Sequence, residues 1–297
     1  MDKSRLREQA RRLVFAAPRL SEALLSGNFR SIFKGRGMDF EALREYGIDD
    51  DALRIDWNAS ARFGKPYVKT YREDRDLNLF IILDESASMD FGSGRSKHES
   101  AVLAASLLAY AASLEGLRVG LLCFGAAEKM EVMAPAAGEE HARVLLERLA
   151  AEKQAAAKAE SPGSALDSAL NMAYILLKRR SLVVIASDFM SSSWAEAIAR
   201  LARRHDVMAM LVKDKLDSEA PQLGFSIHCA DSESGISRFI VPRSMAYKRD
   251  RAHWYKNRHL ERLVAFKAAK IPFLELDSQS DPLDKLIAFF SRRRLAR

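Results

Sequence analysis

The stretch Leu77–Met89, which reads LNLFIILDESASM, decides the fold of the chain. The residues before Asp84 are almost unbroken apolar β-formers, a pattern typical of a short strand buried on both faces of a mainly parallel sheet. Ser86 and Ser88 follow Asp84 at alternate positions, where open α/β sheets place their ligand-binding groups. Because one carboxylate and two hydroxyls form an all-oxygen set, this turn is a candidate site for a hard cation such as Mg²⁺ rather than for zinc or copper.

Predicted strands and helices alternate from residue 77 onward. The run Lys129–Met133 follows a strand expected at 117–124 too closely for a helical crossover, so it must return antiparallel as an edge strand. The sequence SLVVIAS at 181–187 predicts a second doubly buried strand, which also ends at an aspartate, Asp188. We expect helices at 97–114, 139–152, 165–179, 194–204, 244–270 and 282–294, further strands at 206–212 and 271–276, and a hairpin joining 225–230 to 237–242.

This alternation predicts a doubly wound α/β fold with a mainly parallel sheet and one antiparallel edge strand. The ligand crevice of such folds lies beside the first strand, where the chain connections diverge to opposite sides of the sheet. If the strand at 181–187 lies across that point, Asp84 and Asp188 meet at one rim. The loop Glu160–Ala165, ESPGSA, opens a helix near the same rim and contributes Ser161 and Ser164.

The N-terminal quarter of the chain has a different pattern. Residues 1–27 predict two short helices interrupted by Pro18, and residues 31–74 contain short β-prone pieces separated by Gly, Asn and Asp. We therefore expect two parts, a helical arm with a small β-rich segment at residues 1–75 and the α/β domain at residues 76–297.

Composition excludes several classes of protein. The longest apolar run within a predicted helix, Ala101–Leu114, is shorter than the roughly 20 residues that a membrane span needs. The N-terminus, MDKSRLREQARR, is charged and has no signal-type apolar core, so we expect a cytoplasmic protein. Cys123 and Cys229 form neither a disulfide framework nor a zinc pattern. The net charge of +7 is a mild excess over a mixed-charge surface.

Three loops carry a resemblance to known proteins. Asp84-x-Ser86-x-Ser88, a hydroxyl residue before the helix that begins at Ala165, and Asp188 in the sequence SDF together resemble the metal ion-dependent adhesion site of a von Willebrand factor A domain. The preceding pieces, GRGMDFEALREY, DDALRIDWNASAR and YVKTYRED, resemble the bacterial "domain of unknown function 58" family, whose members join such a segment to an A-type domain. This second resemblance covers nearly the whole chain.

The resemblance implies a role for each candidate residue. Ser86 and Ser88 would bind Mg²⁺, or Mn²⁺ or Ca²⁺, through their hydroxyls, and Ser164 would supply the third-loop ligand, with Ser161 as a rival. Asp84 and Asp188 would hold coordinated waters and orient the serines. Two features depart from the family pattern: a serine stands where threonine is usual in the third loop, and Glu85 and Asp90 add negative charge close to the site.

The resemblance also implies a function. A cation ringed by neutral hydroxyls attracts a carboxylate, so we expect a non-enzymatic adaptor that docks an acidic residue of a partner protein. Members of the resembled family commonly accompany MoxR-type AAA+ ATPases, which makes such an ATPase the expected partner.

Two alternative functions remain open on the sequence alone. A nucleic-acid-binding module would use the basic helix at 248–262, KRDRAHWYKNRHLER, in which Trp254 and Tyr255 interleave with cations, together with the arginine tail at 292–294. A phosphohydrolase would use Asp84 as its nucleophile. Aspartate-nucleophile phosphohydrolases carry a second aspartate two residues on, where this chain has Ser86, so an enzyme is not expected.

Overall fold

A computed structural model of the chain describes residues 38–47, 55–73, 78–125, 130–151, 165–191, 193–219, 227–230, 237–242 and 244–295. These residues fall into two compact units, one that ends at residue 73 and one that begins at residue 78. The two helices expected within residues 1–27 lie outside the described residues.

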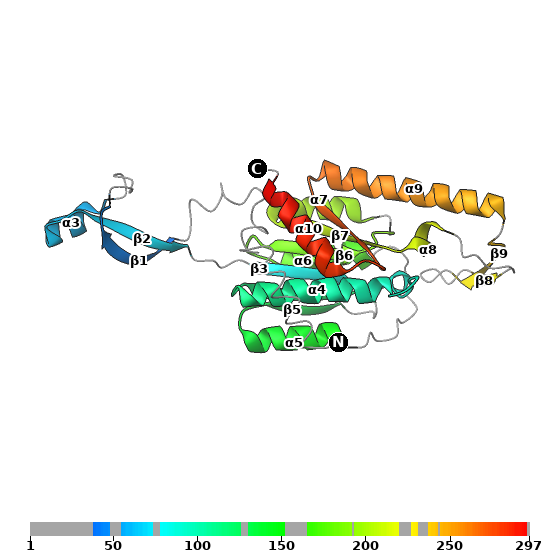
Figure 1. The fold of residues 1–297 in the computed structure, drawn as a ribbon, viewed down its shortest axis with the longest axis horizontal. Coiled ribbons are helices and arrows are strands. Elements are labelled where there is room, and N and C mark those ends of the chain that lie inside the picture. Colours follow the sequence, from blue (N-terminus) through cyan, green and yellow to red (C-terminus); the bar gives the residue numbers. More distant parts are fainter. Residues whose placement is uncertain are drawn as a thin grey trace. The chain divides into compact units, whose positions relative to one another are not determined.

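The smaller unit is an antiparallel pair of strands with one helix between them (Figure 1). β1 (Met38–Glu45) pairs with β2 (Tyr67–Glu73), which agrees with the β-rich segment expected here. α3 (Trp57–Phe63) was not predicted, because the residues around it carry β-prone side chains. Asp56 caps this helix by accepting hydrogen bonds from two amides of its first turn, and Gly64 ends it with a φ of 71°.

The larger unit is built on a six-stranded sheet. Its strand order is β10-β7-β6-β3-β4-β5, and every neighbouring pair is parallel except β4 with β5. The prediction of a doubly wound, von Willebrand A-like sheet with one antiparallel edge strand is therefore confirmed. The strands are β3 (Asn78–Asp84), β4 (Arg118–Phe124), β5 (Glu131–Ala136), β6 (Leu182–Ser187), β7 (Asp206–Lys213) and β10 (Phe273–Asp277).

Helices cover both faces of this sheet (Figure 1). One face packs against α4 (Lys97–Leu114), α5 (Glu139–Ala150) and α10 (Pro282–Leu295), and the other packs against α6 (Ala165–Leu176), α7 (Trp194–Arg204) and α9 (Met245–Ala268). A four-residue helix, α8 (Lys215–Ser218), follows β7, and a hairpin of β8 (Ile227–Ala230) with β9 (Ser237–Ile240) precedes α9. The hairpin was predicted, whereas α8 is too short to produce a helical period.

β3 lies at the centre of the core because both of its faces are covered. Leu79, Ile81 and Leu83 belong to one hydrophobic cluster and Phe80 and Ile82 to the other, as the two-residue period of a strand requires. Burying each side chain of this size contributes about 1.5 to 3 kcal/mol. The strand is thus a rigid base for the turn that follows Asp84. Among the helices that the structure describes, none is both long and apolar enough to cross a membrane.

Candidate metal centre at the carboxyl ends of β3 and β6

The parallel pairing of β3 with β6 brings Asp84 and Asp188 to the same rim of the sheet. Leu83 lies opposite Ala186, so Asp84, the last residue of β3, is level with Ser187, and Asp188 follows one residue after the end of β6. Ser187 joins the two strand ends, because its hydroxyl donates a hydrogen bond of 2.6 Å to Oδ2 of Asp84. The first and fourth strands along the predicted domain thus converge as the sequence pattern indicated.

The turn after β3 places two hydroxyls beside Asp84. The amide of Ser86 donates to Oδ1 of Asp84 at 2.9 Å, and the hydroxyls of Ser86 and Ser88 lie 3.1 Å apart. A single 3₁₀ turn, Ala87–Met89, holds this arrangement, and the side chain of Met89 anchors it in the core. Both serines are half-buried, so their hydroxyls remain within reach of solvent.

Asp84 is a buried carboxyl whose hydrogen-bond donors are neutral groups. Burial raises its pKa to about 6, the negative charge of Asp188 adds to this effect, and the hydrogen bonds from Ser187 and Ser86 only partly offset it. A cation beside Asp84 would stabilise the ionised carboxylate and so oppose both causes of the raised pKa. The donors here are hard oxygens, so the residues fit Mg²⁺ or a similar ion.

Asp188 has a cationic partner of its own, which the sequence analysis missed. The ammonium of Lys97 lies 2.8 Å from Oδ2 of Asp188 and 3.1 Å from Oδ1 of Asp217, and its side chain is almost completely buried. Burial lowers the pKa of Lys97, but the two carboxylates outweigh burial and hold it above its ordinary value. Lys97 is the first residue of α4, where the helix dipole disfavours a cation, and this misplaced charge is the signal that could have revealed a specific partner.

The chain after Asp188 is held in a strained conformation. Phe189 has a φ of 51°, which is unfavourable for a bulky side chain. Its ring packs edge-on against the rings of Trp194 and Phe266, each with a centroid distance of 5.1 Å. Arg262 of α9 donates a 2.6 Å hydrogen bond to the carbonyl oxygen of Asp188. Packing and this hydrogen bond together fix the Asp188 backbone.

Glu85 does not add unbalanced negative charge to the site, contrary to expectation. Its carboxylate receives two hydrogen bonds of 3.1 Å from the guanidinium of Arg148 on α5, and His98 lies 3.9 Å away. Burial opposes the ionisation of Glu85, but the hydrogen bonds and charges of these two partners hold its pKa at about 2. Glu85 thus braces the turn through Arg148, whose guanidinium also pairs with Glu131. Asp90, the other added charge, is exposed.

Asp214 ties the loop before α4 to α8. Its carboxylate accepts hydrogen bonds of 2.9 Å from both the amide and the hydroxyl of Ser93, one of 2.7 Å from the amide of Leu216, and another from the hydroxyl of Ser278. Since Lys97 reaches Asp217 in the same short helix, two buried carboxylates join α8 to the loop that carries Ser86 and Ser88.

The candidate cation site depends on its hydroxyls. Among the residues that the structure describes, no group of three or more His, Cys, Asp or Glu side chains is suited to hold a metal ion. Ser86 and Ser88 therefore have to act as ligands alongside Asp84 if a cation binds here. Ser161 and Ser164, the candidates for the third loop, lie outside the described residues.

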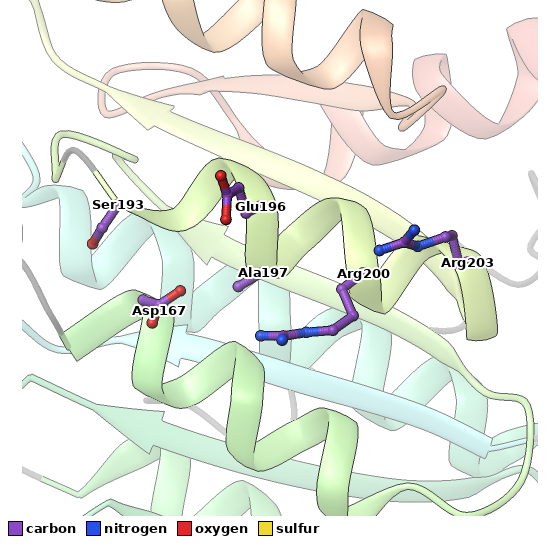
Figure 2. Close-up of a pocket in the computed structure, with 6 residues that line it drawn as sticks. All are labelled: Asp167, Ser193, Glu196, Ala197, Arg200 and Arg203. Atoms are coloured by element: carbon purple, nitrogen blue, oxygen red, sulfur yellow. The ribbon is translucent and has the colours of Figure 1, made fainter.

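A groove of about 380 Å³ lies between α6 and α7 (Figure 2). Two carboxylates, Asp167 and Glu196, stand toward one end, and two guanidinium groups, Arg200 and Arg203, line the rest. Its lining includes none of the residues predicted for the cation site. Arg200 donates a hydrogen bond to the side-chain oxygen of Asn171. Because acidic and basic side chains both line it, the groove is a mixed-charge surface between neighbouring helices.

Comparison with known proteins gives relatives along the whole chain and structures with a partial likeness. An uncharacterized protein of Mycobacterium tuberculosis is 29% identical over 297 residues, which cover 99% of this chain and 92% of the relative. An aerotolerance-related membrane protein from Bacteroides fragilis, solved with multiple mutations to serines, is 18% identical, with 74% of this chain and 99% of that chain covered and a TM-score of 0.42. The conserved hypothetical protein BatB from Bacteroides thetaiotaomicron is 16% identical, with the same coverage and a TM-score of 0.39.

The family comparison covers both structural units. The sequence pattern of the family described as "Protein of unknown function DUF58" matches residues 42–261. The match begins within β1, includes the turns that follow β3 and β6, and ends in α9 next to Arg262. Because this match spans well over half of the chain, the chain belongs to the DUF58 family.

Proposed function

We propose that this chain is a non-enzymatic interaction module that binds an acidic residue of a partner protein through a divalent cation, Mg²⁺ or else Mn²⁺ or Ca²⁺. The observation that carries the proposal is the turn after β3, where a buried carboxylate lies beside two paired hydroxyls and, among the described residues, accepts hydrogen bonds only from neutral groups. A cation bound there would supply an open coordination position that takes an anionic oxygen.

The surrounding residues favour an acidic ligand. Lys97 neutralises part of the negative charge that Asp188 and Asp217 bring to the rim, and Arg148 neutralises Glu85. Together with Asp84, the Asp188, Asp217 and Lys97 group therefore leaves two negative charges at the rim. A divalent cation would offset these two charges, and its open coordination position, beside neutral hydroxyls, would take a carboxylate oxygen of the partner.

For the partner we propose a MoxR-type AAA+ ATPase in the cytoplasm. This follows from the family resemblance of the sequence. The partner would present one exposed Asp or Glu side chain, and the module would serve as an adaptor. A phosphohydrolase is less well supported, because Ser86, and not a second acid, follows two residues after Asp84.

Calorimetry with Mg²⁺ and Mn²⁺ tests the cation site. We expect Ser86→Ala with Ser88→Ala to weaken binding at least tenfold, because both hydroxyl ligands are lost while the Asp84 hydrogen bond from the Ser86 amide remains. Asp90→Asn is the comparison variant: it removes an exposed, solvent-screened charge from the same loop and keeps both hydroxyls, so it should weaken cation binding much less. Equal cation affinity in the wild type and the double alanine variant would refute the assignment.

A pull-down with the ATPase tests the bridge to the partner. EDTA should release the complex, and replacing the essential acidic residue of the ATPase with its amide should cost as much as Ser86→Ala plus Ser88→Ala. Because both changes break one bridge, combining them should cost little more than either alone. Additive losses, or a complex that survives EDTA, would show that the ATPase docks elsewhere.

A further inference from the structure

α9 extends well beyond the rim that carries the candidate cation site. The helix passes the rim at Arg262, which bonds to the carbonyl oxygen of Asp188. The segment from Met245 to Arg262 continues from there for roughly 25 Å at 1.5 Å per residue. Figure 1 shows the N-terminal end of α9 reaching past the ends of the sheet strands and past α8. We call the segment Met245–Glu261 the overhang.

The overhang is held at its inner side and is otherwise uncovered in the part of the chain that the structure describes. Arg251 donates a 2.5 Å hydrogen bond to the carbonyl oxygen of Leu216 in α8. The buried side chains of α9, Arg262 and Phe266, both lie outside the overhang. A helix with so little buried surface either bridges to another body or is supported by side-chain pairs along its length, and the overhang leaves room for a partner on its exposed side.

The exposed side of the overhang combines cations with apolar groups. Lys248, Arg249 and Lys256 are exposed, and so is half of the Trp254 side chain. The two acidic residues of the overhang each have a basic neighbour: Asp250 lies 3.4 Å from Arg249, and Glu261 lies 3.2 Å from Arg258. Among the described residues, Lys248 and Lys256 lack an ion-pair partner, so their charges remain available to a ligand.

We propose that the overhang is a second docking surface, which takes an acidic segment of the same protein partner that reaches the cation site. The inference rests on the proposed function, because it extends that binding surface from the rim along α9. Three observations carry it: the overhang starts at the rim, its unpaired charges are positive, and Trp254 offers the aromatic contact that is enriched at energetically important interface positions.

A nucleic acid fits this surface less well than an acidic protein segment. Base stacking needs free aromatic faces. Tyr255 is half-buried, stacks on the ring of His259 at 6.3 Å, and has the guanidinium of Arg262 over its own ring at 5.4 Å. Trp254 is then the one exposed aromatic ring of the overhang, so successive bases would lack a series of rings to stack on.

Binding of a fluorescein-labelled poly-L-glutamate peptide, followed by anisotropy, tests the inference. We expect Lys248→Glu with Lys256→Glu to weaken binding of this peptide at least tenfold, and Trp254→Ala to weaken it severalfold, in the full chain. Arg203→Glu with Lys285→Glu is the matched control, because it makes the same change in net charge at exposed positions of α7 and α10. The control should bind the peptide within about twofold of the wild type, since these charges lie outside the overhang.

Two further measurements separate this inference from the proposed function. Calorimetry should find unchanged cation affinity in the Lys248→Glu, Lys256→Glu variant, whereas Ser86→Ala with Ser88→Ala should lose the cation and keep the salt-sensitive part of peptide binding. Unchanged cation affinity in the Ser86→Ala, Ser88→Ala variant would overturn the proposed function and still leave the overhang as a docking surface. Wild-type peptide affinity in the overhang variant would overturn the inference, as would tighter binding of a single-stranded oligothymidylate of equal charge.

Discussion

Lys97 controls how much negative charge the rim retains. Its ammonium lies between Asp188 and Asp217, two carboxylates that are as buried as the lysine itself. Desolvating three charges is costly, and the arrangement persists because each charge has a close partner of opposite sign. The lysine thus occupies a position between two carboxylates that a free cation could otherwise take.

Lys97→Met should destabilise the larger unit by about 3 to 5 kcal/mol, because it leaves two buried carboxylates without a counterion. Millimolar Mg²⁺ or Ca²⁺ should recover part of this loss by binding between Asp188 and Asp217, and urea unfolding with and without the cation measures both effects. Lys215→Met breaks the exposed pair with Glu219 in the same unit and should cost well under about 1 kcal/mol. A Lys97→Met variant as stable as the wild type would mean that Lys97 does not stabilise this carboxylate pair.

His205 is expected to make the fold sensitive to acid. Both ring nitrogens are buried and have no hydrogen-bond partner among the residues that the structure describes, and burial, with smaller contributions from Arg204 and Arg180, lowers the pKa of His205 to about 4. The unfolded chain takes up this proton near its usual pKa of about 6.5, while the folded chain resists it until about pH 4. The unfolded state binds more protons in this window, so stability is lost as the pH falls.

The loss of unfolding free energy that is due to His205 should approach about 3 kcal/mol between pH 6.5 and 4. His205→Phe removes the titrating group, and urea unfolding at several pH values should then show a flatter profile across that window. His253→Phe, at an exposed position on α9, is the control and should leave the slope as it is in the wild type. An unchanged slope in His205→Phe would assign the acid sensitivity to other groups.

In the turn from β6 to α7, backbone strain at Phe189 lowers the stability and the packing of its aromatic ring raises it. The left-handed conformation of Phe189 costs about 1 to 3 kcal/mol, but its buried ring joins α7 to α9 through Trp194 and Phe266. Removing a buried phenylalanine ring typically costs about 3 to 5 kcal/mol. Packing therefore outweighs strain, and the strained turn stays in place after Asp188.

Phe189→Gly should consequently destabilise the larger unit by about 1 to 3 kcal/mol, even though glycine tolerates a positive φ. Urea unfolding measures this difference. Phe189→Leu retains the strain and part of the apolar contact, and it should also be less stable than the wild type. A stabilised glycine variant would reverse the ranking of the two effects and show that strain dominates this turn.

The architecture of the larger unit follows from patterns that are visible in the sequence. Doubly buried strands read as continuous apolar runs, and the two runs that end at Asp84 and Asp188 proved to be neighbours in the sheet. The short spacing before β5 predicted its antiparallel direction, because a parallel return needs a longer crossover. Periodicity and connection length were sufficient for this level of the structure.

The counterions of the site could not be predicted in the same way. Lys97 meets Asp188 and Asp217 across 91 and 120 residues of sequence, and Arg148 meets Glu85 across 63. Contacts over such separations depend on how helices pack on the sheet, which a local pattern does not encode. The roles proposed for Asp84, Ser86 and Ser88 remain predictions, as does the choice between Ser161 and Ser164.

The antiparallel edge strand β5 affects how readily copies of the protein associate through their sheets. Pro135 has no amide hydrogen to offer a neighbouring strand, and the exposed Glu131 places a charge at the start of the same edge. An unprotected strand at this position would invite sheet-to-sheet polymerisation. Proline and charge oppose such growth at this edge, so a crowded solution of the protein should resist aggregation through β5.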